Sequence, residues 1–141
     1  FFEDEYKEQV KELEKHSIAH FYGFQSDPRP FYIEADCVVL PSYHEGMSNV
    51  LLEAAATGRP VITSNIPGCR ESVENGKSGL LVEVKNKEML YDAMKEMLHC
   101  SREEREQMGQ AGREKMEREF RKEVVVEKTV QSLREDEKRD F

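Results

Sequence analysis

Two glutamates with a spacing that suits ligand binding lie near the middle of the chain. Glu45 stands beside Gly46 just after a short apolar run, and Glu53 follows with seven residues in between. Glu53 lies in an almost wholly apolar stretch, 50–56, which has the composition of a buried helix. An unpaired carboxylate costs on the order of several kcal/mol in such surroundings. We therefore expect another group to pair with Glu53.

The residues around Glu53 predict a short helix with well-marked ends. Ser48 or Asn49 can cap its start, and Gly58 can take the left-handed conformation just after its end. Helical side chains tilt toward the N-terminus of their helix, so Glu53, about one turn in, can reach toward the loop that carries Glu45. Both carboxylates are therefore expected to face one pocket.

The expected pocket has the features of a nucleotide-diphosphate site. It would lie at the carboxyl end of a parallel strand and at a helix N-terminus, where free N–H groups and the helix dipole favour phosphate. Gly46 would let a ligand approach the backbone, and the amides of Met47, Ser48 and Asn49 would face phosphate oxygens. A carboxylate would accept hydrogen bonds from the two hydroxyls of a ribose. From the residues alone a plainer interpretation stays open, namely a solvated glutamate and an ordinary Glu-Gly turn.

Four short apolar runs predict the strands that position this pocket. They begin about 20 residues apart and cover 18–24, 37–40, 61–63 and 80–84. Helix-compatible segments separate them, and a charged helix, 5–15, precedes the first with Val10 and Leu13 on one side. This alternation predicts an α/β fold, a Rossmann-like parallel sheet with flanking helices.

Beyond residue 84 the sequence predicts helices only. Asn86 can cap the first of them. At about residue 101 the last helices begin, because Ser101 and Glu104 form a capping-box pattern for a helix that runs to about Phe120. A final helix, 124–133, precedes a charged tail.

Composition narrows the classes of function. The 141-residue chain has 29 Asp plus Glu against 21 Lys plus Arg, a formal net charge of -8, which argues against a nucleic-acid partner. Its longest apolar runs hold only a few residues, whereas a helix needs roughly 20 to cross a bilayer, so we expect no transmembrane segment. Cys37, Cys69 and Cys100 lack Cys-x-x-Cys spacing, which favours reduced thiols, a cytoplasmic location and no zinc site.

Three short motifs around the two glutamates carry a family resemblance. They are Pro41-Ser42-Tyr43-His44-Glu45-Gly46, Gly58-Arg59-Pro60-Val61 and Pro67-Gly68-Cys69-Arg70-Glu71. Together with the spacing between Glu45 and Glu53, they resemble the C-terminal half of a retaining glycosyltransferase of family 4, which has the GT-B fold. The resemblance extends from about His20 to the last helix.

The resemblance implies a role for each of these residues. Glu45 would act as the catalytic residue beside the donor sugar and its diphosphate, and Glu53 would hold the ribose hydroxyls. The sugar and phosphates would be cradled by Gly46, Met47, Ser48 and Asn49. The nucleobase would be contacted by the loop of Tyr22, Gly23 and Phe24.

The reaction implied by the resemblance moves a sugar from a nucleotide sugar to a hydroxyl with retention at the anomeric carbon. It needs no metal or other cofactor, and the chain has no Asp-x-Asp pair for a diphosphate-bound metal ion. UDP is favoured over GDP. The acceptor would be a glycan or lipid-linked glycan at the inner membrane face, as in bacterial capsule or O-antigen synthesis. Two alternatives are a GT-B nucleotide-sugar epimerase and a nucleotide-binding module without activity.

The chain also departs from the pattern of this family. The family's C-terminal domain begins with two strands, a Gly-rich turn, and an Arg and a Lys that grip the diphosphate, and none of these precedes Phe1. The N-terminal acceptor domain is absent too. Because the two strands would lie between the runs at Ile18 and Cys37, the sheet should leave a gap or rearrange. We expect 1–141 to be a nucleotide-sugar-binding C-terminal domain that is incomplete at its N-terminus and inactive alone.

Overall fold

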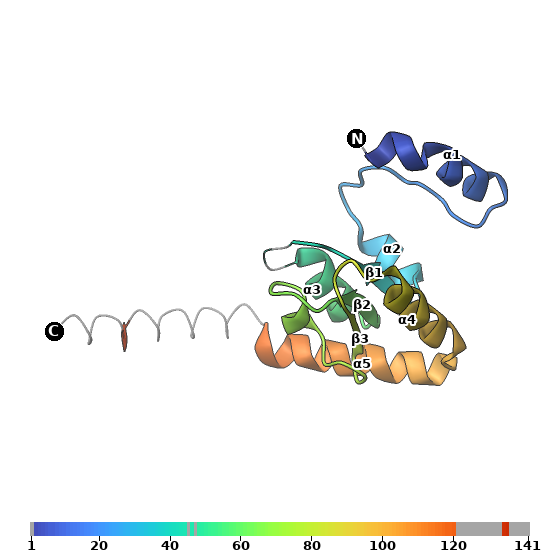
Figure 1. Ribbon diagram of the computed structural model, residues 1–141. Coiled ribbons are helices and arrows are strands. Elements are labelled where there is room, and N and C mark those ends of the chain that lie inside the picture. The colour runs from blue at the N-terminus through green and yellow to red at the C-terminus, as the bar shows by residue number, and fades with distance from the viewer. Residues whose placement is uncertain (1, 45, 47, 121–133, 136–141) are drawn as a thin grey trace.

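The chain folds around one small parallel sheet. The computed structural model describes residues 2–44, 46, 48–120 and 134–135, with side chains from Tyr6 onward. Its sheet has the strand order β1-β2-β3 (Figure 1). The elements are α1 (Phe2–Lys15), α2 (Arg29–Glu34), β1 (Val38–Leu40), α3 (Asn49–Ala56), β2 (Val61–Ser64), the 3₁₀ turn η1 (Arg70–Ser72), β3 (Gly79–Val82), α4 (Lys87–His99) and α5 (Arg102–Glu119). The predicted α/β class is confirmed, and three of the four predicted strands are present.

Helices cover both faces of the sheet. The alternation of β2 turns Val61 toward one face and Ile62 toward the other. On the first face the core holds Tyr32, Leu51, Ala54, Val61, Cys69 and Val73. On the second face it holds Ile62, Val82, Ala93 and Met97. Since α3 supplies the first core and α4 the second, each apolar helix stripe is buried against one face of β2, all of whose residues are buried.

The predicted helix starts are confirmed by side-chain caps. Ser48 Oγ accepts a hydrogen bond from the Leu51 N–H, and Asn86 Oδ1 accepts one from the Met89 N–H at 2.9 Å. Ser101 Oγ accepts one from the Glu104 N–H at 3.1 Å. Each cap satisfies a donor that the first turn of a helix leaves without an intrahelical partner.

The region predicted as a strand at 18–24 is not a strand, and that prediction was wrong. The segment is irregular and its apolar side chains are exposed: Ile18 is 71% exposed, Phe21 79% and Phe24 94%. A strand forms only where its backbone N–H and C=O groups pair with a neighbour. Within the described residues β1 pairs with β2 alone, and no strand lies beside 18–24.

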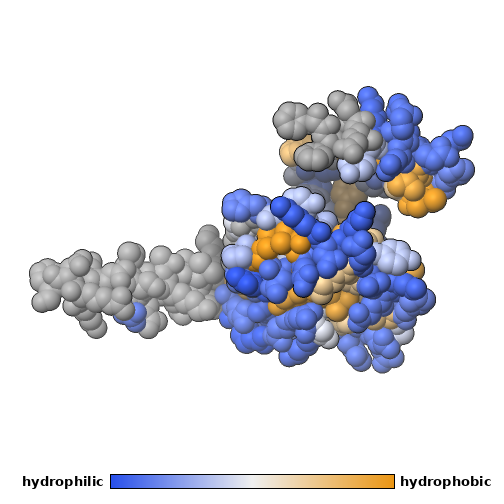
Figure 2. Space-filling view, in the orientation of Figure 1, coloured by the Kyte–Doolittle hydropathy of each residue, from blue (hydrophilic) through white to orange (hydrophobic). Residues whose placement is uncertain are grey.

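Of the helices predicted near the two ends of the sequence, the first is confirmed and the last lies outside the described residues. The helix predicted at 5–15 is confirmed as α1, and its side chains Val10 and Leu13 are 40% and 42% exposed. The helix predicted at 124–133 lies outside the described residues, as does all of the charged tail except Arg134 and Glu135. Figure 2 shows a mostly hydrophilic face on which hydrophobic residues form small, separate patches.

A backbone contact between two glycines brings α5 against the end of α3. Gly58 follows α3 in the left-handed region with φ +79°, and its carbonyl faces Gly109 of α5. A Cβ atom added to Gly109 would lie 1.9 Å from the Gly58 oxygen. Only glycine at position 109 therefore lets the two backbones meet as they do.

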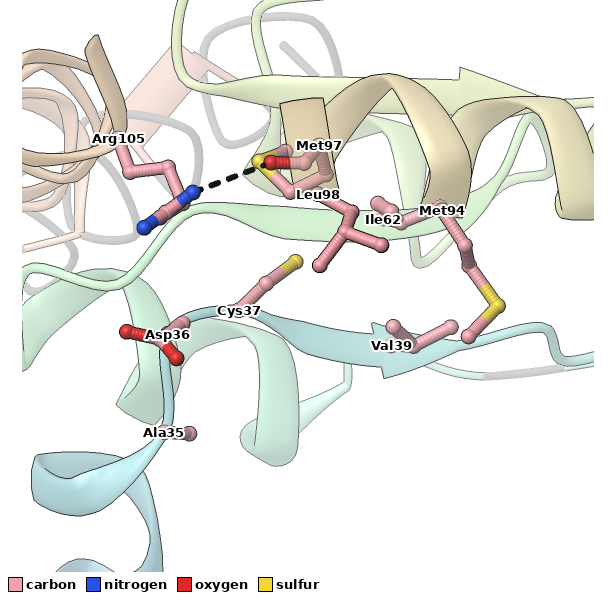
Figure 3. A pocket seen from close by; sticks show the side chains of 9 residues that line it. All are labelled: Ala35, Asp36, Cys37, Val39, Ile62, Met94, Met97, Leu98 and Arg105. Atoms are coloured by element: carbon pink, nitrogen blue, oxygen red, sulfur yellow. Dashed lines mark hydrogen bonds between the residues drawn. The ribbon is translucent and has the colours of Figure 1, made fainter. Parts of the chain in front are cut away.

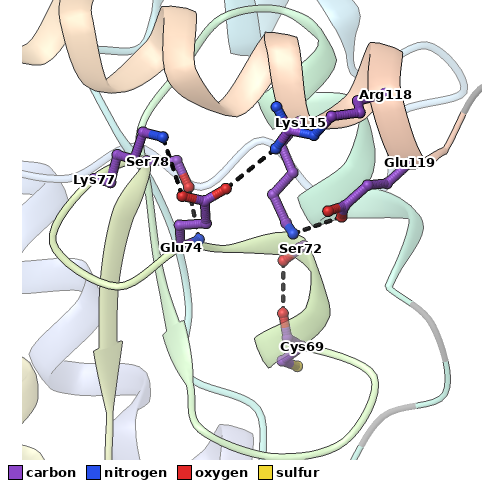
Figure 4. A network of polar contacts seen from close by, with 8 residues as sticks. All are labelled: Cys69, Ser72, Glu74, Lys77, Ser78, Lys115, Arg118 and Glu119. Atoms are coloured by element: carbon purple, nitrogen blue, oxygen red, sulfur yellow. Dashed lines mark hydrogen bonds and ion pairs between the residues drawn. The ribbon is translucent and has the colours of Figure 1, made fainter.

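Polar contacts attach the other end of α5 to the loop before β3 (Figure 4). The Glu74 carboxylate accepts from Arg118 at 3.2 Å and pairs with Lys77 at 3.4 Å. Lys115, which is only 8% exposed, pairs with Glu119 at 2.6 Å. The buried ammonium thus keeps a partner one turn along its own helix.

Replacing Gly109 with alanine tests the close approach of α5 to α3. The added methyl group cannot be accommodated without moving a backbone, so we expect a loss of about 1–3 kcal/mol in the free energy of unfolding, measured by urea titration. Gly112→Ala is the matched control on the same helix, because its Cβ would meet Ser78 Cβ at an ordinary 3.6 Å. Equal stability of the two variants would contradict the contact.

Candidate functional site

The carboxyl ends of the three strands lie on the same side of the sheet. Because the strands are parallel, the loops after Leu40, Ser64 and Val82 all leave from this edge. The loop after β1 leads into α3 and contains the predicted phosphate-binding segment. Edges of this kind are where open parallel sheets bind their ligands, so the candidate site is built from these loops and the first turn of α3.

Ser48 fixes the loop after β1 to the loop after β2. Its side chain is buried and caps α3, while its backbone N–H donates to the Gly68 carbonyl at 3.1 Å. Gly68, with φ +89°, in turn donates its own N–H to Glu71 Oε2 at 2.8 Å. The Ser48 amide is therefore engaged within the protein rather than available for phosphate, and Asn49 supplies the first residue of α3.

The structure describes only some of the remaining residues of the expected phosphate loop. Glu45 and Met47 lie outside the described residues, so their predicted roles stay predictions. Gly46 is exposed, and a Cβ atom there would meet no atom within 4 Å. No described residue is close enough to require glycine at position 46. The backbone there borders open space.

Glu53 is exposed, and the expectation that it lies on a wholly buried helix was wrong. The buried side of α3 consists of Leu51, Ala54 and Ala55. Asn49, Val50 and Glu53 are exposed and share the opposite side at helical spacing. The sequence predicted a wholly apolar helix because alanines lie on both its buried and its exposed side. The Glu53 carboxylate therefore reaches solvent and can receive a ligand.

A phenol and a guanidinium from α2 lie near Glu53, and sequence reasoning missed both. The pKa of Tyr32 is raised above its ordinary 10.0, first by burial and then by the charge of Glu53 and a hydrogen bond with it. Arg29 pairs with Asp27 at 2.8 Å, and its pKa is raised mainly by that pair, with a further contribution from Glu53. Arg59 holds α2 in place by donating to the carbonyl oxygens of Tyr32, at 3.0 Å, and Ile33. Nothing in the local sequence signals these contacts, because Tyr32 and Glu53 are 21 positions apart in the chain.

The predicted nucleobase loop is connected to this region through α2. The Tyr22 ring packs against Phe31 of α2 with ring centroids 4.7 Å apart, and Gly23 has φ +66°. Phe24 is 94% exposed. The structure thus brings Tyr22 to the helix that carries Tyr32, whereas Phe24 contacts solvent.

A separate cavity of about 430 Å³ lies between β1 and α4 (Figure 3). Its walls are mainly apolar, from Val39, Ile62, Met94 and Leu98. The Cys37 thiol in it has its pKa raised to about 11, chiefly by burial, so the reactive thiolate is scarce near neutral pH. This cavity offers packing surface rather than catalytic groups.

Neither a metal cluster nor a membrane-spanning helix is found among the described residues. Within that part of the chain, no three His, Cys, Asp or Glu side chains gather as they would around a metal ion. No helix there is long and apolar enough to span a bilayer. The three cysteines are free thiols.

Comparison with known proteins identifies relatives that cover most of the chain. The family model described as "Glycosyl transferases group 1" matches residues 2–115. The capsular polysaccharide biosynthesis glycosyltransferase CapM of Staphylococcus aureus is 33% identical over 102 residues, which is 72% of this chain and 27% of that protein. The chain therefore spans only about a quarter of the length of this relative.

Solved structures show the same fold. The C-terminal domain of the glycosyl transferase group 1 family protein LpcC from Francisella tularensis superposes with a TM-score of 0.70 at 25% identity, covering 84% of this chain and 64% of that one. Anabaena HepE, solved in complex with UDP, superposes with a TM-score of 0.79 at 21% identity, covering 96% and 38%. The GT-B fold of these neighbours confirms the predicted fold class.

The contact between Tyr32 and Glu53 can be tested by titration. In Glu53→Gln the negative charge is lost, so the pKa of Tyr32 should fall yet stay above 10.0, because burial is the larger cause. Nuclear magnetic resonance of isotope-labelled tyrosine measures it, with Tyr32→Phe for assignment and Glu34→Gln of α2 as control. Since the folded pKa exceeds the unfolded one, the associated stability is present below pH 10.0 and is lost as the pH rises through the folded pKa. An unchanged pKa in Glu53→Gln would show that the two groups do not interact.

Proposed function

The chain belongs to the group 1 glycosyltransferases, and from this premise we propose that it is the donor-binding part of a retaining family 4 enzyme. Residues 1–141 would form its nucleotide-sugar-binding C-terminal domain, incomplete at the N-terminal side. The reaction would transfer a sugar from a nucleotide sugar to a glycan or a lipid-linked glycan. Capsule or O-antigen synthesis is the proposed setting, supported by the similarity to the capsular enzyme CapM.

The observation that carries this proposal is the exposed Glu53 carboxylate one turn into α3. It lies on the solvent side of a capped helix that follows a parallel strand. Beside the Tyr32 phenol, whose pKa it helps to raise, the carboxylate keeps lone pairs for a pair of hydroxyl donors. Glu53 would hold the ribose of the donor, and Tyr32 would orient the carboxylate.

The start of α3 would face the diphosphate. The positive end of the helix dipole stabilises negative charge that grows on the leaving diphosphate. Gly46, Met47 and Asn49 would line the diphosphate and sugar, with Glu45 as the catalytic residue beside the sugar. Ser48 would act through its cap and its bond to Gly68, which fix the loop.

We further propose UDP as the nucleotide, without a metal ion or other cofactor. The fold neighbour HepE was solved with UDP, which supports a UDP-sugar donor. Tyr22, Gly23 and Phe24 would contact the base, since Tyr22 packs on the helix that holds Tyr32. Transfer would take place in the cytoplasm, at the inner face of the membrane where a lipid-linked acceptor is anchored.

Calorimetric titration of UDP and GDP into the chain tests the role of Glu53. We expect UDP to bind, and Glu53→Ala to weaken binding about ten- to hundredfold, because a charge-assisted hydrogen bond contributes about 1.5–3 kcal/mol. Glu96→Ala, an exposed glutamate on α4, is the control and should bind as the wild type does. Equal affinity of Glu53→Ala and wild type would remove the ribose contact from Glu53.

Assays of sugar transfer test the reaction class. The isolated 141-residue chain should transfer no sugar, and detectable transfer would refute its proposed inactivity. A longer protein that contains this chain should yield a glycosylated acceptor with the donor's anomeric configuration. An epimerised nucleotide sugar without an acceptor product would instead indicate an epimerase.

A further inference from the structure

The Arg59 side chain joins the end of α2 to the end of α3. Its Nε donates to the Tyr32 carbonyl at 3.0 Å, and its Nη2 donates to the Ile33 carbonyl. The last carbonyl groups of a helix have no partner within the helix. In α2 the Phe31 carbonyl accepts from the Ala35 N–H, and the next two carbonyls accept from the guanidinium. Arg59 therefore caps α2 from far along the chain.

The backbone of Arg59 is fixed to the end of α3. Gly58 donates its N–H to the Ala55 carbonyl at 2.9 Å, and Arg59 donates its own to the Ala54 carbonyl at 3.1 Å. With Gly58 at φ +79°, these two bonds form the Schellman pattern that ends a helix. Pro60 follows directly, is buried and leads into β2. The guanidinium thus extends from a backbone that is held on both sides.

The two helices that Arg59 joins carry the groups that meet at Glu53. Tyr32 of α2 is buried in the core on the α3 side of the sheet, and its pKa is raised first by burial and then by Glu53. Arg29 of α2 has its pKa raised mainly by Asp27 and further by Glu53. An isolated helix shorter than about 12 residues is marginal in water, and α2 has 6. Its position beside Glu53 therefore depends on tertiary contacts such as those of Arg59.

We propose that Arg59 is a positioning residue for donor binding, which keeps Tyr32 of α2 beside Glu53 of α3 so that the carboxylate faces the ribose. This step rests on the proposed function, in which Glu53 holds the ribose hydroxyls. Arg59 acts through α2 and not by contact with the nucleotide. Lysine cannot take over this role, because a guanidinium donates through a rigid fork of N–H groups, whereas an ammonium is a compact point charge.

Calorimetric titration of the 141-residue chain with UDP and with its dideoxy analogue, which lacks both ribose hydroxyls, tests this proposal. The wild type should prefer UDP, because only UDP offers Glu53 the two hydroxyl donors. We expect Arg59→Lys to weaken UDP binding about three- to tenfold and to leave binding of the analogue unchanged. The loss should be smaller than in Glu53→Ala, since the carboxylate is still present.

Tyr32→Phe shows whether Arg59 acts through the phenol. It keeps the ring in the core and removes the hydroxyl, so we expect it to weaken UDP binding by a similar factor. When Arg59→Lys is added to Tyr32→Phe, no further loss should follow, because the two residues act in series. Arg113→Lys, at an exposed position on α5, is the matched control and should bind UDP as the wild type does.

A measurement without nucleotide checks the same link. Arg59→Lys keeps the positive charge but loosens the end of α2, so the burial of Tyr32 and its contact with Glu53 should both decrease. The pKa of Tyr32 should then fall, in the same direction as in Glu53→Gln. Nuclear magnetic resonance of labelled tyrosine measures this pKa, and Arg113→Lys should leave it unchanged.

Three results would overturn the role of Arg59. The first is a folded Arg59→Lys chain that prefers UDP over the analogue as strongly as the wild type does. The second is equal weakening of both nucleotides, which indicates an anchor for the domain as a whole. The third is an unchanged preference for UDP in Tyr32→Phe, which decides the question even if Arg59→Lys does not fold.

These failures can be told apart from a failure of the proposed function. If the wild type prefers UDP and Glu53→Ala loses that preference, the ribose contact stands whatever Arg59→Lys does. If the wild type binds UDP and the analogue equally, the ribose contact of Glu53 is overturned, and the role of Arg59 is overturned with it.

Discussion

The burial of β2 between two strands and two helices is the constraint on which the rest of the structure depends. All four of its residues are buried, and even Thr63 is satisfied by donating to the Leu40 carbonyl at 2.9 Å. Parallel pairing on both sides makes the three strands end together. A shift of one residue would exchange the faces of Val61 and Ile62 and so remove both cores at once. The loops of the candidate site are therefore located by packing far more than by their own sequences.

The orientation of α3 follows from contacts at its two ends. At its start Ser48 caps the helix and bonds to Gly68, so the helix N-terminus is fixed against the loop after β2. At its end Gly58 turns left-handed, and its carbonyl meets Gly109 of α5. Between these points small alanines face the core, which leaves Glu53 on the outer side. Glycine and alanine thus determine where the carboxylate points, although neither has chemistry of its own.

Features set by neighbouring residues could be predicted from the sequence, whereas features set by distant ones could not. The caps at Ser48, Asn86 and Ser101 are local, and the three strands of the sheet follow from apolar runs between turns. The run at 18–24 has the same local pattern, yet a strand also needs a partner, and none pairs with it among the described residues. The contact between Tyr32 and Glu53 is likewise tertiary, because it depends on Arg59 holding α2 against the sheet. The exposure of Glu53 was missed because alanines made both sides of its helix look apolar.

A parallel sheet gathers the loops that follow its strands at one edge, and in this chain the candidate chemistry lies on the α3 side of that edge. On the α3 face an exposed carboxylate lies near a helix N-terminus, an arrangement suited to a ribose and a diphosphate. On the α4 face the carboxyl ends of the strands border a cavity of about 290 Å³, whose charged side chains carry both signs. One loop, which carries Tyr43 and Ser48, separates the two, and Lys85 contacts that loop from the far side. The loop after β1 is therefore the boundary between the two faces at this edge.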